Sequence, residues 1–155
     1  FTPRGVLLGD GNLRHHLVCI TVRGVFRRVV KLGPLAVKFP RWKHFSQGRR
    51  CNRWERESWQ VWRPRFGWTS LCPVLLADQF GFILVMRRAR QPVTEKDLDE
   101  FHENRPHPDY IVECKESDHG YIDGQVVTLD YGYPDEDMVV AQRVYYRGFG
   151  WEATP

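Results

Sequence analysis

Residues 113–132, with the sequence ECKESDHGYIDGQVVTLDYG, constrain the fold of this chain more than any other stretch. Asp123 and Gly124 precede a short β-branched run, and Asp-Gly at such a place is typical of a tight turn that opens a strand. The run ends at Asp130, and Gly132 follows shortly after it. A carboxylate at the end of a buried strand can present an oxygen ligand to Mg²⁺. We therefore expect a hairpin that ends either in an ordinary surface carboxylate or in a metal ligand.

The first part of the chain is predicted to be β-structure. In residues 35–39 the apolar side chains alternate, so Lys38 faces the side opposite to Leu35, Val37 and Phe39. Turn sequences rich in Gly, Asp, Asn and Pro separate this run from the earlier ones. The predicted strands are residues 6–8, 17–22, 25–32 and 35–39.

A helix is predicted from about Arg50 to Trp62, because apolar side chains recur there at spacings of three and four residues. Glu57 shares one face of this helix with apolar neighbours, whereas Glu55 shares another with Trp59. The face of Glu57 consists of Trp54, Glu57, Ser58 and Val61.

The remaining elements follow from turn and capping signals. Strands are predicted at 71–77 and 82–86, on either side of a turn at 78–81. Thr94 precedes several acidic residues, which is typical of a helix start. A last helix is predicted from about 138 to 146. The chain is thus expected to form one α+β domain over residues 1–155.

Charge divides the chain into two halves. Residues 1–70 hold 15 Lys and Arg against three Asp and Glu, whereas residues 71–155 hold eight against 16. This asymmetry indicates two functional faces, two lobes held partly by mutual attraction, or simply solvated arginine faces. The basic half is also suited to attract the phosphate of a nucleotide or of nucleic acid.

Composition narrows the class of protein further. A hydrophobic content of 42% is typical of a globular chain. No apolar run approaches the about 18 residues that a membrane-spanning helix requires. The four cysteines lie singly, without the spacing of a zinc site, so we expect reduced thiols and a cytoplasmic protein with no membrane contact.

Taken in order, the motifs of residues 25–132 resemble the protein-kinase fold. The resemblance implies a kinase-like N-lobe in residues 1–90, made of an antiparallel sheet of about five strands plus one helix. It implies a minimal, truncated C-lobe in residues 91–155. The motifs are Ala36-Val37-Lys38 on a strand, a helix glutamate, the strand and hinge of Ile83 to Ala89, the loop Glu113 to Asp118, and Asp130-Tyr131-Gly132.

In the N-lobe half, the resemblance implies three contacts to ATP. Lys38 would neutralise phosphate charge, and Glu57, with Glu55 as the alternative, would hold Lys38 in place. Backbone groups of the hinge at Met86 would hydrogen-bond the adenine.

In the second half, the resemblance implies a metal site and a catalytic loop. Asp118 and Asp130 would hold Mg²⁺, and Glu113 would orient or deprotonate the acceptor hydroxyl. Lys115 stands where the family's catalytic-loop lysine falls.

The sequence also departs from the kinase pattern. Glu113 replaces the catalytic Asp, Asp118 replaces the metal-binding Asn, and Tyr131 replaces a Phe. No Gly-x-Gly-x-x-Gly precedes Lys38 at the usual distance. We therefore expect a severely reduced kinase or a pseudokinase-type module that binds a partner protein and, as a cofactor, Mg²⁺ with ATP. A small active ATP-dependent phosphotransferase is the alternative.

Residues 41–68 support a third class, a basic nucleic-acid-binding protein. Arginines alternate there with Trp42, Trp54 and Trp68, and stacking residues among cations suit single-stranded nucleic acid. The competing interpretation is that the tryptophans pack a helix and the arginine stems cover them.

Overall fold

The structure is a computed structural model and describes residues 19–104 and 115–132. The strand predicted at 6–8 and the helix predicted at 138–146 lie outside these residues, as does Glu113. The described elements, in chain order, are β1 (Cys19–Arg23), β2 (Arg27–Leu32), β3 (Leu35–Pro40), the 3₁₀ turn η1 (Trp42–His44), α1 (Phe45–Glu57), the π-helical turn η2 (Ser58–Trp62), α2 (Arg63–Phe66), β4 (Val74–Ala77), β5 (Leu84–Arg87), α3 (Glu95–Asn104), the 3₁₀ turn η4 (Glu116–Asp118), β6 (His119–Ile122) and β7 (Gln125–Thr128).

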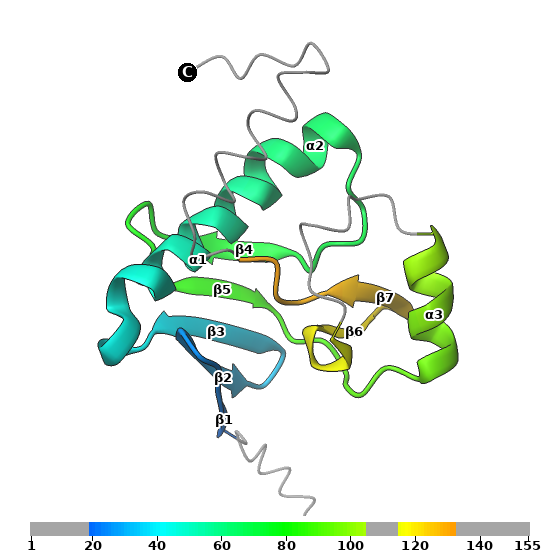
Figure 1. Cartoon of the computed structure of the whole chain (residues 1–155), viewed down its shortest axis with the longest axis horizontal. Coiled ribbons are helices and arrows are strands. Elements are labelled where there is room, and N and C mark those ends of the chain that lie inside the picture. The colour runs from blue at the N-terminus through cyan, green and yellow to red at the C-terminus, as the bar shows by residue number, and fades with distance from the viewer. Residues whose placement is uncertain (1–18, 105–114, 133–155) are drawn as a thin grey trace, which may run out of the picture.

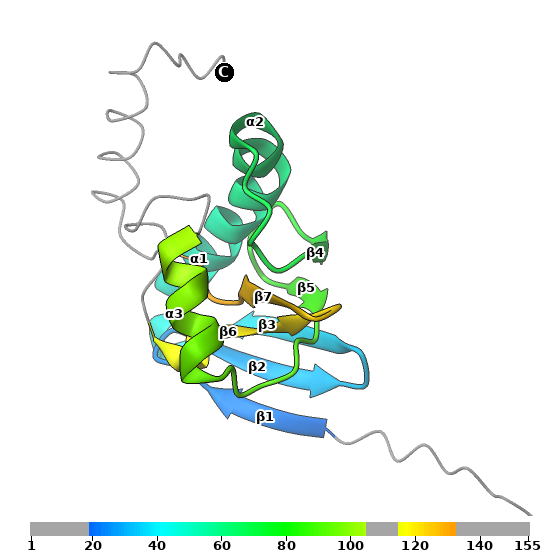
Figure 2. The same ribbon diagram turned by 90° about the vertical axis from the view of Figure 1, so that its right-hand side faces the viewer.

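The main sheet has five strands in the order β1-β2-β3-β5-β4, and every neighbouring pair is antiparallel. Helix α1 connects β3 to β4 through η2 and α2 and packs against both strands. Figures 1 and 2 show this helix lying over one face of the sheet. The expected α+β class, with about five antiparallel strands and one main helix, is confirmed.

Register decides which side chains of β2 and β3 face α1. Val29 lies directly opposite Lys38 across the hairpin, so the two side chains project from the same face of the sheet. Arg27 precedes Val29 by two positions and therefore projects from that face as well. The turn at Gly33, where φ is 51°, joins the two strands and sets this register.

Helix α1 begins at Phe45, earlier than predicted, and the buried face differs from the predicted one. Trp54 and Ser58 of the predicted face are buried, but so are Cys51, Asn52 and Glu55, whereas Val61 is exposed. These buried positions follow a spacing of three to four residues, but most of them are polar, so hydrophobic periodicity does not reveal the stripe. The π-helical turn η2 adds a residue to the turn and brings Trp62 rather than Val61 into the core.

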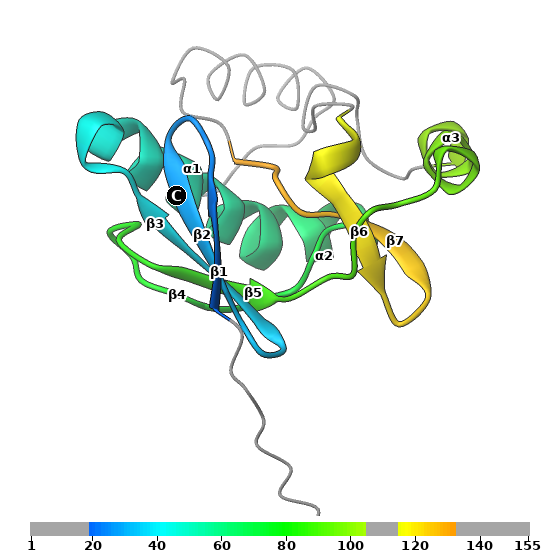
Figure 3. The same cartoon turned by 90° about the horizontal axis from the view of Figure 1, so that it is seen from below.

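The second structural unit is the hairpin β6–β7, with α3 beside it (Figure 3). Its turn consists of Asp123 and Gly124, both with positive φ, as the Asp-Gly pair predicts. Thr94 caps α3 as predicted, because its Oγ1 accepts a hydrogen bond from the backbone N–H of Asp97 at 3.2 Å. No helix in the two described ranges is long and apolar enough to cross a membrane.

Two backbone junctions tie this hairpin to the rest of the protein. Thr128 donates its N–H to the carbonyl of Ser70 at 2.7 Å and accepts one from Cys72 at 2.8 Å. Arg90 and Tyr121 exchange backbone hydrogen bonds at 2.9 and 3.0 Å. The end of β7 is thereby held beside the segment that leads into β4, and β6 beside the segment that leaves β5. The hydrophobic core spans this junction and includes Trp62, Trp68, Leu71, Leu84, Met86, Val127 and Tyr131.

Candidate functional site

Lys38 of β3 and Glu55 of α1 form a buried ion pair. The Nζ of Lys38 lies 2.8 Å from Oε1 and 2.9 Å from Oε2 of Glu55, and Glu55 has no exposed surface. Two charges without solvent require close, well-directed partners, because desolvation costs several kcal/mol per ion. The short distances to both carboxylate oxygens supply that compensation.

Arg27, the first residue of β2, is the second buried cation. Its guanidinium donates to Glu55 Oε1 at 2.9 Å and to Asn52 Oδ1 at 3.2 Å, and it forms an ion pair with Asp130. Burial disfavours its charge, but the carboxylates of Asp130 and Glu55 outweigh burial and raise the pKa of Arg27 above its ordinary value. Arg27 therefore stays charged at every accessible pH.

The segment that follows β7 completes the site. Lys38 Nζ donates to the backbone carbonyl of Leu129 at 2.6 Å, and the N–H of Tyr131 donates to Glu55 Oε1 at 3.2 Å. Gly132 lies so close to α1 that a Cβ there would be 2.8 Å from the carbonyl of Cys51. The closeness of this segment to α1 accounts for glycine at position 132.

Asp130 is the exposed member of the site. Its side chain keeps 52% of its surface accessible, whereas that of Arg27 keeps 6%. Burial disfavours the ionised carboxyl, but the charges of Arg27 and Lys38 outweigh burial and hold the pKa of Asp130 well below its ordinary value. We call Arg27, Lys38, Glu55 and Asp130 the ion cluster.

The ion cluster contains two of the residues predicted for the site, Lys38 and Asp130. It also corrects the predicted partner of Lys38. The carboxylate that pairs with Lys38 is that of Glu55, so the choice of Glu57 was wrong and the alternative holds. The reason is the buried stripe of α1, on which Glu55 is fully buried and Glu57 is half-buried. Arg27 was missed, because nothing in a strand pattern distinguishes one buried arginine among many exposed ones.

The other predicted site residues that the structure describes, Asp118, Lys115 and Met86, are not members of the ion cluster. The backbone carbonyl of Asp118 accepts the N–H of Leu129 at 2.6 Å, and its carboxylate accepts the hydroxyl of Ser117 at 3.2 Å. Lys115 is exposed at the start of η4. Met86 is buried in the core of the sheet, where it pairs with Ala36 of β3.

The segment after Met86, predicted to be a hinge, has most of its backbone donors engaged within the protein. The N–H of Arg87 bonds to the carbonyl of Pro73 at 3.2 Å, that of Arg88 to Pro34 at 2.7 Å, and that of Arg90 to Tyr121 at 3.0 Å. These N–H groups are therefore not available to the edge of a purine base in this conformation.

The tryptophans of residues 41–68 mostly belong to the core. Trp54, Trp62 and Trp68 are buried, and the guanidinium of Arg63 stacks over Trp59 at 4.2 Å from the ring centroid. This arrangement agrees with the interpretation in which tryptophans pack a helix and arginine stems cover them. Buried rings offer no face on which a nucleic-acid base can stack.

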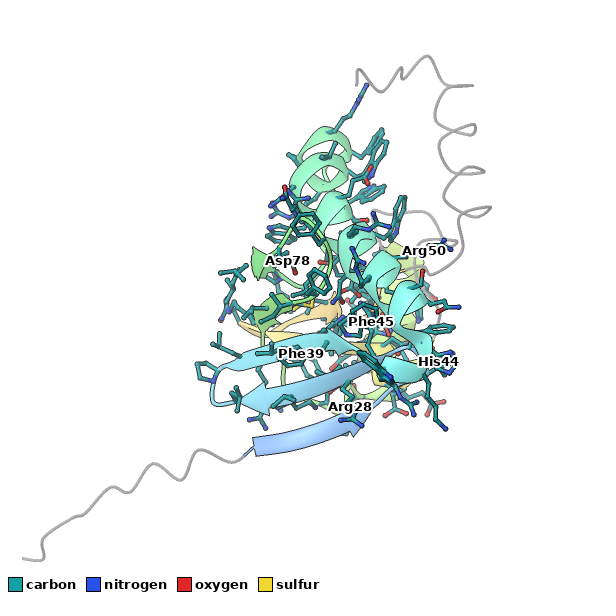
Figure 4. All side chains as sticks on the ribbon, turned by 90° about the vertical axis from the view of Figure 1, so that its left-hand side faces the viewer. Arg28, Phe39, His44, Phe45, Arg50 and Asp78 are labelled. Atoms are coloured by element: carbon teal, nitrogen blue, oxygen red, sulfur yellow. The ribbon has the colours of Figure 1, made fainter. Side chains whose placement is uncertain are left out.

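A row of exposed rings, of which only Trp42 belongs to the predicted nucleic-acid-binding set, lies where α1 begins. The rings of Trp42 and Phe45 are 5.8 Å apart, those of Phe45 and Phe82 5.9 Å, and those of Phe82 and Phe80 6.1 Å. Arg49 stacks over Phe82 at 4.5 Å. Figure 4 views this side, with Phe45 and Asp78 of the β4–β5 turn labelled. We call these four aromatic residues the ring row.

Comparisons of the chain with models of known protein families, with curated proteins and with solved structures found no match.

Proposed function

We propose that this chain is a kinase-like module of the pseudokinase type, which binds a partner protein and a phosphate-bearing ligand rather than transferring phosphate. The observation that carries the proposal is the ion cluster. A strand lysine pairs with a helix glutamate and contacts the backbone immediately before an Asp-Tyr-Gly segment. This is the pairing that the kinase resemblance requires of Lys38, with Glu55 as its partner.

Two features favour binding over catalysis. Arg27 pairs with Asp130, the residue that would have to hold Mg²⁺, and a guanidinium at that carboxylate repels a divalent cation. The N–H groups of Arg87 and Arg88, which would receive the adenine, are used inside the protein, so we expect ATP to be held by its phosphates rather than by its base. Metal-assisted phosphoryl transfer depends on positioning and on charge neutralisation, and both would require the site to rearrange.

A phosphotransfer assay tests the absence of catalysis. The protein is incubated with Mg²⁺, γ-labelled ATP and generic protein and small-molecule acceptors, beside the variant Lys38→Met. We expect the same background transfer from both proteins. Transfer that the Lys38→Met variant lacks would instead establish the alternative, a small active phosphotransferase.

Thermal unfolding tests the ligand site. A ligand that binds only the folded chain stabilises it by about 2.7 kcal/mol at a hundredfold excess over its Kd. We expect ATP to raise the unfolding temperature of the native protein and not of the Lys38→Met variant. If ATP has no effect on either, the ligand site is lost from the proposal and only the partner surface remains.

The ring row is the surface we assign to the partner protein. Trp42 is 89% exposed, and aromatic side chains of this kind are enriched among the residues that dominate interface energies. Residues 41–56 carry six Lys and Arg, and their single acidic residue, Glu55, is buried in the ion cluster. The charge of this surface therefore selects a partner segment that combines acidic with apolar side chains.

A labelled synthetic peptide tests the partner surface. The probe is a helix-forming peptide of Glu, Leu and Phe, and its control has Lys in place of each Glu. We expect only the acidic peptide to bind, and Trp42→Ala to weaken binding by about 2 kcal/mol, whereas Val61→Ala, another exposed apolar position, leaves it unchanged. Equal binding of both peptides, or no effect of Trp42→Ala, would contradict the assignment.

A further inference from the structure

The charges of the ion cluster are divided unevenly between its buried and its exposed part. Arg27, Lys38 and Glu55 have side-chain exposures of 6%, 6% and 0%, and together they carry one net positive charge. Asp130, with 52% of its side chain exposed, supplies the negative charge that balances them. The cluster is thus a buried cationic site whose counter-ion lies at the surface of the protein.

The buried cations are held in place independently of Asp130. Asn52 accepts from Arg27, and its own amide donates to the carbonyls of Lys38 at 3.3 Å and Gly81 at 3.0 Å. Lys38 is held by Glu55 and by the carbonyl of Leu129. A rotation of the Asp130 side chain would therefore leave both cations in their present positions.

The residues do not fit the Mg²⁺ that the kinase resemblance implies. The carboxylate of Asp130 is engaged by a guanidinium, and a divalent cation there would lie next to two positive charges, Arg27 and Lys38. Among residues 19–104 and 115–132, no group of three or more His, Cys, Asp or Glu is placed to hold a metal ion. An anion, by contrast, fits here, because the guanidinium that now contacts Asp130 is a usual donor to phosphate oxygens. Lys38 contributes charge but no donor, since its three N–H groups are taken by Glu55 and by the carbonyl of Leu129.

We infer that Arg27, supported by the nearby charge of Lys38, forms a phosphate-binding site in which Asp130 is an internal anion, so that an incoming phosphate group replaces the Asp130 carboxylate and needs no Mg²⁺. This inference deepens the proposed ligand site and rests on the ion cluster being that site. It reverses the expected role of Asp130, which competes with the ligand instead of helping to hold it.

The test measures the binding of inorganic phosphate, ATP and adenosine, each with Mg²⁺ or with EDTA, by calorimetry. The variants are Asp130→Asn, Arg27→Met and Arg27→Lys, and Arg28→Met is the matched control, since Arg28 is the exposed neighbour on the same strand. For phosphate and for ATP, we expect the affinity measured with EDTA to equal the affinity of the same ligand measured with Mg²⁺. Asp130→Asn should tighten binding at least tenfold, Arg27→Met should abolish it, and Arg27→Lys should retain part of it.

Each outcome decides between the possible roles of the cluster. Loss of ATP binding in Asp130→Asn, or binding that requires Mg²⁺, would overturn the internal-anion role and favour a metal site, while leaving the proposed nucleotide function intact. Phosphate binding that ATP does not improve upon would support the inference and remove the nucleotide from the proposed function. Absence of phosphate binding in both the native protein and a folded Asp130→Asn variant would overturn the inference.

Discussion

Two ionic contacts of the main sheet, one to the β6–β7 hairpin and one to α1, differ in burial rather than in geometry. Arg87 of β5 holds Asp123 of the hairpin turn through two hydrogen bonds of 2.7 and 2.9 Å, but the two side chains are 43% and 73% exposed. The pair of Lys38 and Glu55 has similar distances and almost no exposure. Water solvates the charges of the first pair and not those of the second. Removing one partner therefore leaves an uncompensated charge only in the buried pair.

Removal of the central carboxylate is expected to have the largest effect. Glu55→Gln keeps the size of the side chain but leaves two buried cations without their shared counter-charge, and should lower the free energy of unfolding by about 3–5 kcal/mol. Urea denaturation measures the loss. Glu57→Gln, on the same helix but half-buried, is the matched control and should cost much less. Equal losses in the two variants would mean that burial does not distinguish them.

Gly132→Ala is expected to cause the second-largest loss of stability. The added methyl group would lie 2.8 Å from the carbonyl of Cys51 and 3.0 Å from Nη1 of Arg27, so the Asp-Tyr-Gly segment must move away from α1. We expect a loss of about 1–3 kcal/mol, as for other overpacked sites. Urea denaturation of Gly132→Ala and of the larger Gly132→Ser should show increasing losses. Native stability in both variants would show that the segment does not need this close approach.

Acid should weaken the ion cluster through Asp130. Its pKa in the folded protein is lowered from 3.8, so its contribution to stability is fully present well above that value and declines as the pH falls below it towards the folded pKa. The urea midpoint of the native protein should therefore fall more steeply between pH 5 and pH 3 than that of Asp130→Asn. Parallel curves for the two proteins would contradict the lowered pKa.

Breaking the exposed pair of Arg87 and Asp123 should have the smallest effect on stability. Arg87 also lowers the pKa of Asp123, through hydrogen bonds and charge, but both groups are solvated, and salt screens their attraction. Arg87→Gln is expected to leave the urea midpoint unchanged at physiological ionic strength. A large loss of stability that persists in high salt would mean that this surface contact stabilises the fold as much as the ion cluster does.

Local patterns predicted several parts of this fold from the sequence. The Asp123-Gly124 turn, the Thr94 cap and the alternation around Lys38 each depend on a few neighbouring residues, and each appears in the structure as expected. Lys38 and Asp130 were identified as site residues, and they do lie in one cluster.

The remainder of the site depends on geometry that a sequence pattern does not contain. Arg27 is buried because the register of the β2–β3 hairpin places it on the same face as Lys38. This placement can be predicted only once Val29 is known to lie opposite Lys38. Glu55 was ranked below Glu57 because the helix face was drawn through Val61, which is exposed. The π-helical turn at Ser58–Trp62 shifts that face, and no local signal announces it.

A double-mutant cycle between Arg27 and Asp130 tests the ion cluster most directly. The free energies of unfolding of the native protein, Arg27→Met, Asp130→Asn and the double variant are measured in urea at neutral pH. Because Asp130 is half-exposed, we predict a modest coupling energy of about 1 kcal/mol, within the range seen for residues in contact. Strictly additive losses would contradict the pairing of Arg27 with Asp130, and with it the cationic site that we assign to the end of β7.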